Sequence, residues 1–192
     1  KEHAIGTIGR HAHGFNMDYA DMNGDGRLDI VSVTRRGAAW FQQPEVIDEG
    51  WIGHPIGAFH PDSLAGMTLV DIDGDGDQDL FAGGYSRGSR LDESLTPIDS
   101  PLGRLAWFEN PGADSQLGKD WARHDVSRRK RGMFDQFIAR DLDGDGDMDL
   151  LSTRGNSAPY DGVFWLEQVR TTKPTPRFKA ARSQESEEVG LP

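Results

Sequence analysis

An acidic loop occurs three times in this chain and constrains its fold more than any other feature. The copies read DMNGDGRLD at 21–29, DIDGDGDQD at 71–79 and DLDGDGDMD at 141–149, and an apolar segment follows each one. Other landmarks recur in the same order. AAWFQQP, LAWFENP and VFWLEQ follow the three loops, and WIGHPIG and WARHDVS follow the first two of these segments. Self-similarity of this kind indicates a chain built from structural repeats.

Each repeat predicts four short β-strands and no helix, as the first repeat illustrates with GFNMDYADM, LDIVSVT, AAWFQQ and WIGHPIG. The loops begin 50 and then 70 residues apart, and an insertion at 84–103 accounts for most of the difference. A unit of this size corresponds to one blade of a β-propeller. We therefore expect an all-β fold, a β-propeller with three four-stranded blades that form part of a larger ring. Residues 1–168 would hold the repeats and residues 169–192 a C-terminal tail.

Oxygen-bearing side chains occupy positions 1, 3, 5 and 9 of each acidic loop. Oxygen ligands at alternate positions of a loop bent by glycine can converge on a hard cation, and Ca²⁺ accepts six to eight of them. A backbone carbonyl at position 7 would add another ligand, with the side chains of Asp77 and Asp147 pointing outward. The candidate ligands are Asp21, Asn23, Asp25, Arg27 and Asp29; Asp71, Asp73, Asp75, Asp77 and Asp79; and Asp141, Asp143, Asp145, Asp147 and Asp149.

The alternative to three calcium sites is three acidic surface turns without a metal. The loops hold thirteen of the 32 acidic residues, which would repel one another without a counter-ion, and three calcium ions would move the formal charge from −11 to −5. Mg²⁺ is disfavoured because it requires strict octahedral geometry. An EF-hand is excluded because position 12 holds Ser32, Ala82 and Ser152 instead of glutamate. About three Ca²⁺ ions, one per loop, are therefore expected.

The order of a strand, DxDGDGxxDL, a second strand and a Trp-Phe strand resembles the FG-GAP or VCBS repeat family, which builds integrin-α-like propellers. The resemblance spans about residues 1–168. It implies a calcium ion in the loop between the first and second strands of each blade, with a structural role. Asn23 is the one departure from aspartate among the twelve side-chain ligands, and it would weaken the first site.

Three blades do not close a propeller, which needs roughly four to eight. The third repeat lacks a WxxH segment, while EHAIG at 2–6 matches the end of WIGHPIG and is expected to be a spare fourth strand. His3, His54 and His124 are then equivalent. Either the missing blades belong to a longer chain, or a second copy completes the ring, each copy lending its N-terminal strand. The start inside a motif favours the longer chain.

Repeated side chains are expected to be structural, and function is expected where the pattern breaks. The repeated histidines and Trp40, Trp107 and Trp165 are therefore interpreted as packing residues. Loops before the first strands and the insertion at 84–103 would share the propeller face opposite the acidic loops. Ordinary solvated loops are the alternative. The candidate ligand face comprises His11, His13, His60, Asp62, Tyr85, Arg87 and Arg90.

Three functional classes are open. The first is a module that binds a protein or glycan partner on the ligand face. The second is a carbohydrate lyase or dehydratase using His11, His13, Tyr85 and Arg87 in proton transfer. The third is an architectural part of a larger assembly. No nucleophile elbow, phosphate loop or catalytic carboxylate pair lies outside the acidic loops, which favours binding over catalysis.

Charge and composition exclude further classes. A formal charge of −11 argues against nucleic-acid and anionic-membrane partners. No apolar run approaches the ~20 residues that cross a bilayer, and no cysteine is present for disulfides or zinc. Extracellular calcium modules are weak and fill where calcium is plentiful. A secreted, periplasmic or cell-surface location is therefore expected.

Overall fold

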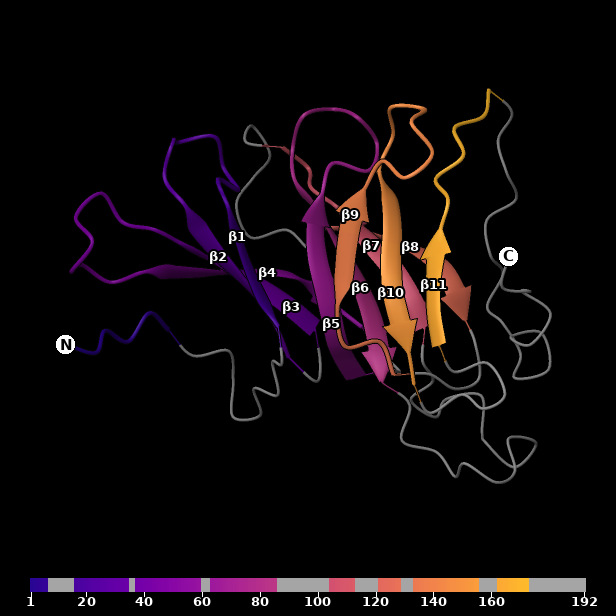
Figure 1. Ribbon diagram of the computed structural model, residues 1–192. Coiled ribbons are helices and arrows are strands. Elements are labelled where there is room, and N and C mark those ends of the chain that lie inside the picture. The colour runs from indigo at the N-terminus through magenta and orange to yellow at the C-terminus, as the bar shows by residue number, and fades with distance from the viewer. Residues whose placement is uncertain are drawn as a thin grey trace.

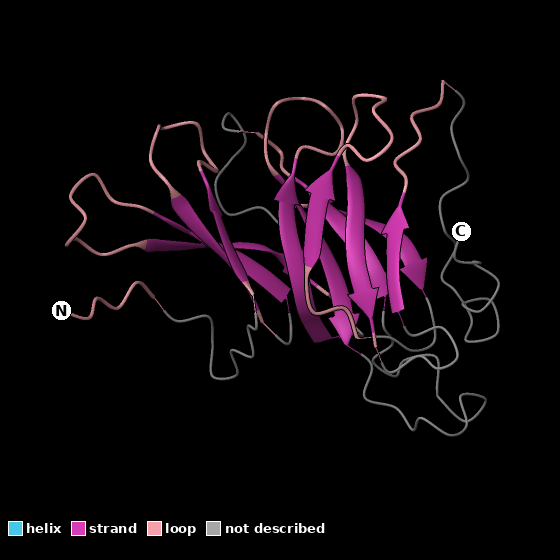
Figure 2. Ribbon diagram, viewed as in Figure 1, coloured by secondary structure: helices cyan, strands magenta, loops and turns pink. Residues whose placement is uncertain are grey.

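The computed structural model describes residues 1–6, 16–34, 37–59, 63–85, 104–112, 121–128, 133–155 and 162–172. These residues form eleven β-strands and no helix, so the all-β prediction is confirmed (Figures 1 and 2). No helix in this described part could span a membrane. The strands are β1 (Met17–Ala20), β2 (Asp29–Val33), β3 (Gly37–Gln42), β4 (Ile52–Ala58), β5 (Ser63–Val70), β6 (Asp79–Tyr85), β7 (Arg104–Glu109), β8 (Ala122–Arg128), β9 (Phe137–Arg140), β10 (Asp149–Arg154) and β11 (Gly162–Leu166).

The strands form three antiparallel sheets, each a meander in chain order, and each sheet is one propeller blade. The first blade is β1-β2-β3-β4, the second is β5-β6-β7-β8 and the third is β9-β10-β11. The third blade thus has three strands within the described residues, where four per blade were expected. The missing WxxH segment of the third repeat explains the difference. The described residues thus form three blades of a partial β-propeller.

The blades pack face to face around their first strands, since β1 contacts β5 and β5 contacts β9. One apolar cluster fills the space between the first and second blades, with Val31, Ile56 and Phe108 at 0%, 0% and 1% exposure. A second cluster around Phe81 and Phe137 joins the second and third blades. β6 is buried along nearly its whole length because the second blade has a neighbour on both faces. Burying each such large side chain stabilises the fold by about 1.5–3 kcal/mol.

The repeated tryptophans and histidines pair within the blades, as a structural role requires. Trp40 of β3 stacks on His54 of β4, and Trp107 of β7 stacks on His124 of β8, with ring centroids 4.3 Å apart in both pairs. Each histidine Nε2 also meets a side-chain oxygen at the end of the third strand, at 3.1 Å from Gln42 and 2.7 Å from Glu109. These pairs fasten the outer strand of each blade to the strand beside it.

The N-terminal segment corrects one expectation. EHAIG was expected to be a fourth strand, but residues 1–6 belong to no sheet of the described chain. The segment instead lies along the first blade. His3 Nδ1 is 3.0 Å from a carboxylate oxygen of Asp48, and a Cβ atom at Gly6 would lie 2.5 Å from the Phe41 ring. A strand needs a hydrogen-bonded neighbour, and the segment has none within the described residues.

Candidate metal centre

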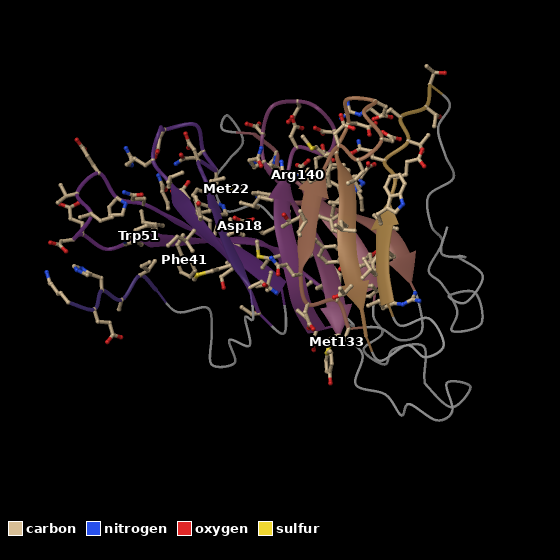
Figure 3. All side chains as sticks on the ribbon, in the orientation of Figure 1. Asp18, Met22, Phe41, Trp51, Met133 and Arg140 are labelled. Carbon is tan, nitrogen blue, oxygen red and sulfur yellow. The ribbon has the colours of Figure 1, made fainter. Side chains whose placement is uncertain are left out.

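The three acidic loops lie at the same end of the blades, each between the first and second strands of its sheet (Figure 1). Side-chain oxygens gather at this end, as Figure 3 shows. Two glycines shape each loop. Gly74 and Gly76 have φ angles of 82° and 99°, and Gly144 and Gly146 have 83° and 95°, a region that side chains with a Cβ rarely adopt. The glycines at positions 4 and 6 thus let the backbone curl around its carboxylates, as expected.

The carboxylate at position 1 organises the loop from inside. Asp71 accepts hydrogen bonds from the backbone N–H groups of Gly74 and Gly76, at 2.7 and 3.1 Å. Asp141 accepts the equivalent pair from Gly144 and Gly146, at 2.7 and 3.1 Å. Carboxylates that accept such bonds are oriented before any ligand arrives. The backbone therefore holds the first ligand position in place.

Two of the loops bring three carboxylates together. One oxygen each from Asp71, Asp73 and Asp79 lie within 4.8 Å of one another, and so do oxygens of the three equivalent aspartates of the third loop. Hard carboxylate oxygens at this spacing fit a cation such as Ca²⁺. The members of the second cluster are Asp141, Asp143 and Asp149.

The first loop is different in two respects. Asn23 replaces an acid, and its amide donates a hydrogen bond to an Asp25 carboxylate oxygen at 3.0 Å. The Arg27 guanidinium also pairs with Asp25. Burial alone would raise the pKa of Asp25, but these hydrogen bonds and the charge of Arg27 hold it below its usual value. An internal cation therefore already neutralises part of this loop.

The aspartate at position 9 has a second task, which the loop pattern did not reveal. Asp29, Asp79 and Asp149 are 0%, 1% and 1% exposed. In each, one oxygen accepts the N–H of loop position 2, at 2.9–3.0 Å, and the other accepts an N–H just beyond the third strand, at 2.8–3.0 Å. The donors are Met22 and Gln43, Ile72 and Asn110, and Leu142 and Gln168. This carboxylate therefore joins the loop to the end of the third strand through its two hydrogen bonds.

Burial disfavours the ionised form of several of these carboxylates while no cation is bound. It raises the pKa of Asp79 to about 6, above its ordinary 3.8, and the neighbouring Asp73 and Asp75 add to the effect. Burial likewise raises the pKa of Asp29 and Asp73. A divalent cation reverses this balance because it favours the charged form. The centre is therefore electrostatically suited to cation binding.

Position 7 corrects a further expectation. The side chain of Asp147 was expected to point outward, yet it is 8% exposed and lies 3.7 Å from Arg170. Burial raises its pKa, as does the adjacent Asp145. Arg170 also donates a hydrogen bond to the Ile72 carbonyl at 3.1 Å, and Gln168 donates to the same carbonyl at 2.6 Å. The segment after β11 therefore ties the third acidic loop to the second.

The candidate ligand face is barely represented in the described chain. Tyr85 ends β6, at the opposite end of that strand from the acidic loop, and forms a bridge with Met133. That position agrees with a surface facing away from the acidic loops. The remaining candidates lie outside the described residues: His11, His13, His60, Asp62, Arg87 and Arg90.

Meandering blades with a glycine-bent acidic loop after each first strand define a repeat protein of the propeller class. Comparison with known families agrees. The model of the FG-GAP-like repeat matches the chain twice, at residues 21–82 and 71–152. These matches cover more than half of the chain, and the chain belongs to the FG-GAP-like repeat family. Comparison with curated proteins found no match.

The raised pKa of Asp79 predicts a pH dependence in metal-free protein. The folded state binds this proton more tightly than the unfolded state, so the stabilisation is present below pH 3.8 and is lost as pH rises through about 6. From about pH 4 to 7 the loss from this group is on the order of 3 kcal/mol. Urea unfolding of metal-free wild type and Asp79→Asn should show a flatter pH profile for the variant. Parallel profiles would contradict the assignment.

Proposed function

We propose that the chain is a calcium-binding propeller module whose ions are structural. The observation that carries this proposal is the convergence of Asp71, Asp73 and Asp79 within 4.8 Å on a loop already curled by its glycines. The third loop repeats the arrangement. Asp75, Asp145 and the carbonyls at position 7 would complete the coordination spheres. Asp21, Asn23, Asp25 and Asp29 form the first and weakest site, because Arg27 competes for Asp25.

The role of the ion is to hold strands, since the ligands are the residues that join them. The buried aspartate at position 9 would contact the cation while it brackets the third strand, and Asp71 and Asp141 begin the same loops. Binding energy at such a site becomes folding energy. Holding strands does not require any of these ligands to transfer a proton. This role therefore agrees with a scaffold that presents a partner-binding surface.

The binding surface proposed for this module is the face opposite the acidic loops, with a protein or glycan as partner. The end of β6 at Tyr85 supports the direction of this face. Weak calcium sites fill only where calcium is abundant. We therefore place the protein outside the cytoplasm: secreted, periplasmic or at a cell surface. Further blades or a second copy would cover the two open blade faces.

Calcium should stabilise the protein strongly. Occupying two sites at about ten to a hundred times their dissociation constants adds about 3–5 kcal/mol, which raises the melting temperature of a chain of this size by about 10 °C. Calorimetric titration of metal-free protein should show at least two sites. The same concentration of Mg²⁺ should produce little stabilisation, because Mg²⁺ prefers a strict octahedral geometry.

Matched variants assign the sites. Asp71→Asn and Asp141→Asn should each abolish one calcium site and about half of the thermal shift, since each removes a converging carboxylate charge. Asp48→Asn, on an exposed loop away from the clusters, is the control and should bind as wild type. Unchanged stoichiometry in both loop variants would refute calcium binding by these residues.

A further inference from the structure

The first blade leaves open a face that is buried in the other two. Met17 of β1 is 70% exposed, whereas its equivalents Met67 of β5 and Phe137 of β9 are 4% and 3% exposed. The three positions are equivalent by register, pairing with Ser32, Ala82 and Ser152. Tyr19, on the same face as Met17, is 66% exposed. This face has the side chains of an inter-blade contact without the neighbouring blade.

The third blade has the complementary open face. Val163 of β11 is 74% exposed, while its equivalents Ala38 of β3 and Leu105 of β7 are 6% and 2% exposed. Ile138 lies on the same face at 48% exposure, where the equivalent Thr68 has 8%. The side that faces the next blade is thus buried in blades one and two and open in blade three. One end of the blade stack therefore exposes the side that normally faces the preceding blade, and the other end exposes the side that normally faces the next blade. A head-to-tail contact joins two such different surfaces.

The outer edge of the third blade lacks a strand that the other blades have. β4 and β8 each place a histidine on the tryptophan of the third strand, in His54 on Trp40 and His124 on Trp107. Trp165 is the equivalent tryptophan of β11, and β11 is the edge of its sheet within the described residues. An edge strand offers unpaired backbone groups that another strand can take up.

Residues 1–6 already lie where the outer strand of a preceding blade belongs. In the contact between the first and second blades, a Cβ atom at Gly57 of β4 would lie 2.8 Å from the Phe108 ring. Gly6 meets the equivalent Phe41 in the same way, at 2.5 Å. His3 precedes Gly6 by three residues, as His54 precedes Gly57. Figure 3 labels Phe41 on the side of the first blade that faces the N-terminal segment.

These observations share one solution. We propose that a second copy of this chain docks head to tail, its third blade against the open face of the first blade, and that residues 1–6 become the fourth strand on the second copy's β11. His3 then stacks on the second copy's Trp165, which repeats the pairs seen in the other blades. A second copy fits both open faces, because its third blade presents the side that the first blade lacks as a neighbour and its β11 presents the edge that residues 1–6 would join. The same contact at the other end gives a closed ring of six blades, within the range of known propellers.

This inference rests on the part of the proposed function that leaves two blade faces to be covered, and it does not depend on calcium. The first test is molar mass by light scattering, in calcium and in chelator. A mass of twice 21.2 kDa is expected. A monomer at high micromolar concentration in both conditions would overturn the proposal and would point to blades of a longer chain. A dimer without calcium binding would refute only the metal proposal.

Complementation tests the head-to-tail geometry. Met17→Asp places a charge on the open face of the first blade, and Val163→Asp places one on the open face of the third blade. Each variant alone should therefore be monomeric. Mixed in equal amounts, they should form dimers again, because one of the two contacts then joins two unmodified faces. Both side chains are exposed, so an unchanged circular dichroism spectrum is the fold control, and the melting temperature of the mixture should return toward that of wild type as dimers form. Failure of the mixture to dimerise, or dimers in either variant alone, would overturn the arrangement.

A third variant tests the strand exchange itself. His3→Ala should weaken dimerisation about fivefold to a hundredfold, since it removes one aromatic stack from each of the two contacts of the dimer. Glu2→Ala, the adjacent exposed residue, is the matched control and should dimerise as wild type. Trp fluorescence should also change on dimerisation of wild type and change less in His3→Ala. Identical dissociation constants for the two variants would refute a role for residues 1–6 at the contact.

Discussion

Asp79→Ala is expected to lower the free energy of unfolding by about 2–4 kcal/mol even without calcium. Asp79 is 1% exposed, and its two oxygens accept hydrogen bonds from the Asn110 and Ile72 N–H groups at 2.8 and 2.9 Å. Alanine would leave both donors without their acceptor, at about 1–3 kcal/mol each. Removing a buried charge returns part of this cost, since burial already opposes ionisation there.

Asp75→Ala is the matched control for this prediction. Asp75 belongs to the same loop but is exposed and accepts one hydrogen bond, from the Asp77 N–H at 2.9 Å. In chelator it should change stability by no more than about 0.5 kcal/mol. In calcium both variants should also lose the stabilisation due to the ion. Denaturant unfolding of the two variants under both conditions separates the contribution of the Asp79 hydrogen bonds from that of the metal ion. Equal stability of both variants in chelator would show that the hydrogen bonds accepted by Asp79 do not stabilise the fold.

The sequence was sufficient to predict the strands because local patterns set them. A β-strand on either side of a Gly-rich acidic turn requires only residues within one repeat, and the recurrence of the unit gave the prediction three independent supports. The tryptophan and histidine positions followed in the same way. Packing roles repeat with the blade, so a position that recurs at equal spacing reports the scaffold.

Contacts between blades could not be read from the repeats. Gln168 and Arg170 reach Ile72, 96 and 98 residues earlier in the chain, and thereby join two acidic loops. Nothing in the local pattern at 168–170 indicates this partner. The contact of Asp147 with Arg170 was missed in the same way, because Arg170 lies in the segment after the third repeat. The pairing of Arg27 with Asp25 is local but depends on side-chain conformation, which spacing does not define.

The N-terminal segment shows the limit of sequence matching. EHAIG has the residues of a fourth strand, yet a strand is a property of two segments, and the described chain offers no partner edge beside residues 1–6. The segment does take an equivalent packing position, because Gly6 meets Phe41 as Gly57 meets Phe108. Similar residues thus gave a similar packing position without the hydrogen-bond ladder.

Gly66→Ala is the second substitution expected to have a large effect. Gly66 lies in β5, at a shift of register against β6, and the backbone leading into β9 passes directly over it. A Cβ atom there would approach the Phe134 carbonyl oxygen and lie 2.7 Å from the Asp135 carbonyl carbon. Backbone cannot rotate away as a side chain can, so the third blade would have to shift. We expect a loss of about 3 kcal/mol or more, at the upper end for overpacked cores.

Gly50→Ala is the control, because a Cβ atom at Gly50 meets no atom within 4 Å. It should leave stability within about 0.5 kcal/mol of wild type. Denaturant unfolding followed by tryptophan fluorescence would measure both variants, and hydrogen exchange would locate the damage. Faster exchange in β9 and β10 than in β2 and β3 is expected of Gly66→Ala, since the methyl group separates the third blade from the second. A wild-type unfolding curve for Gly66→Ala would mean that the blades are not packed in this way.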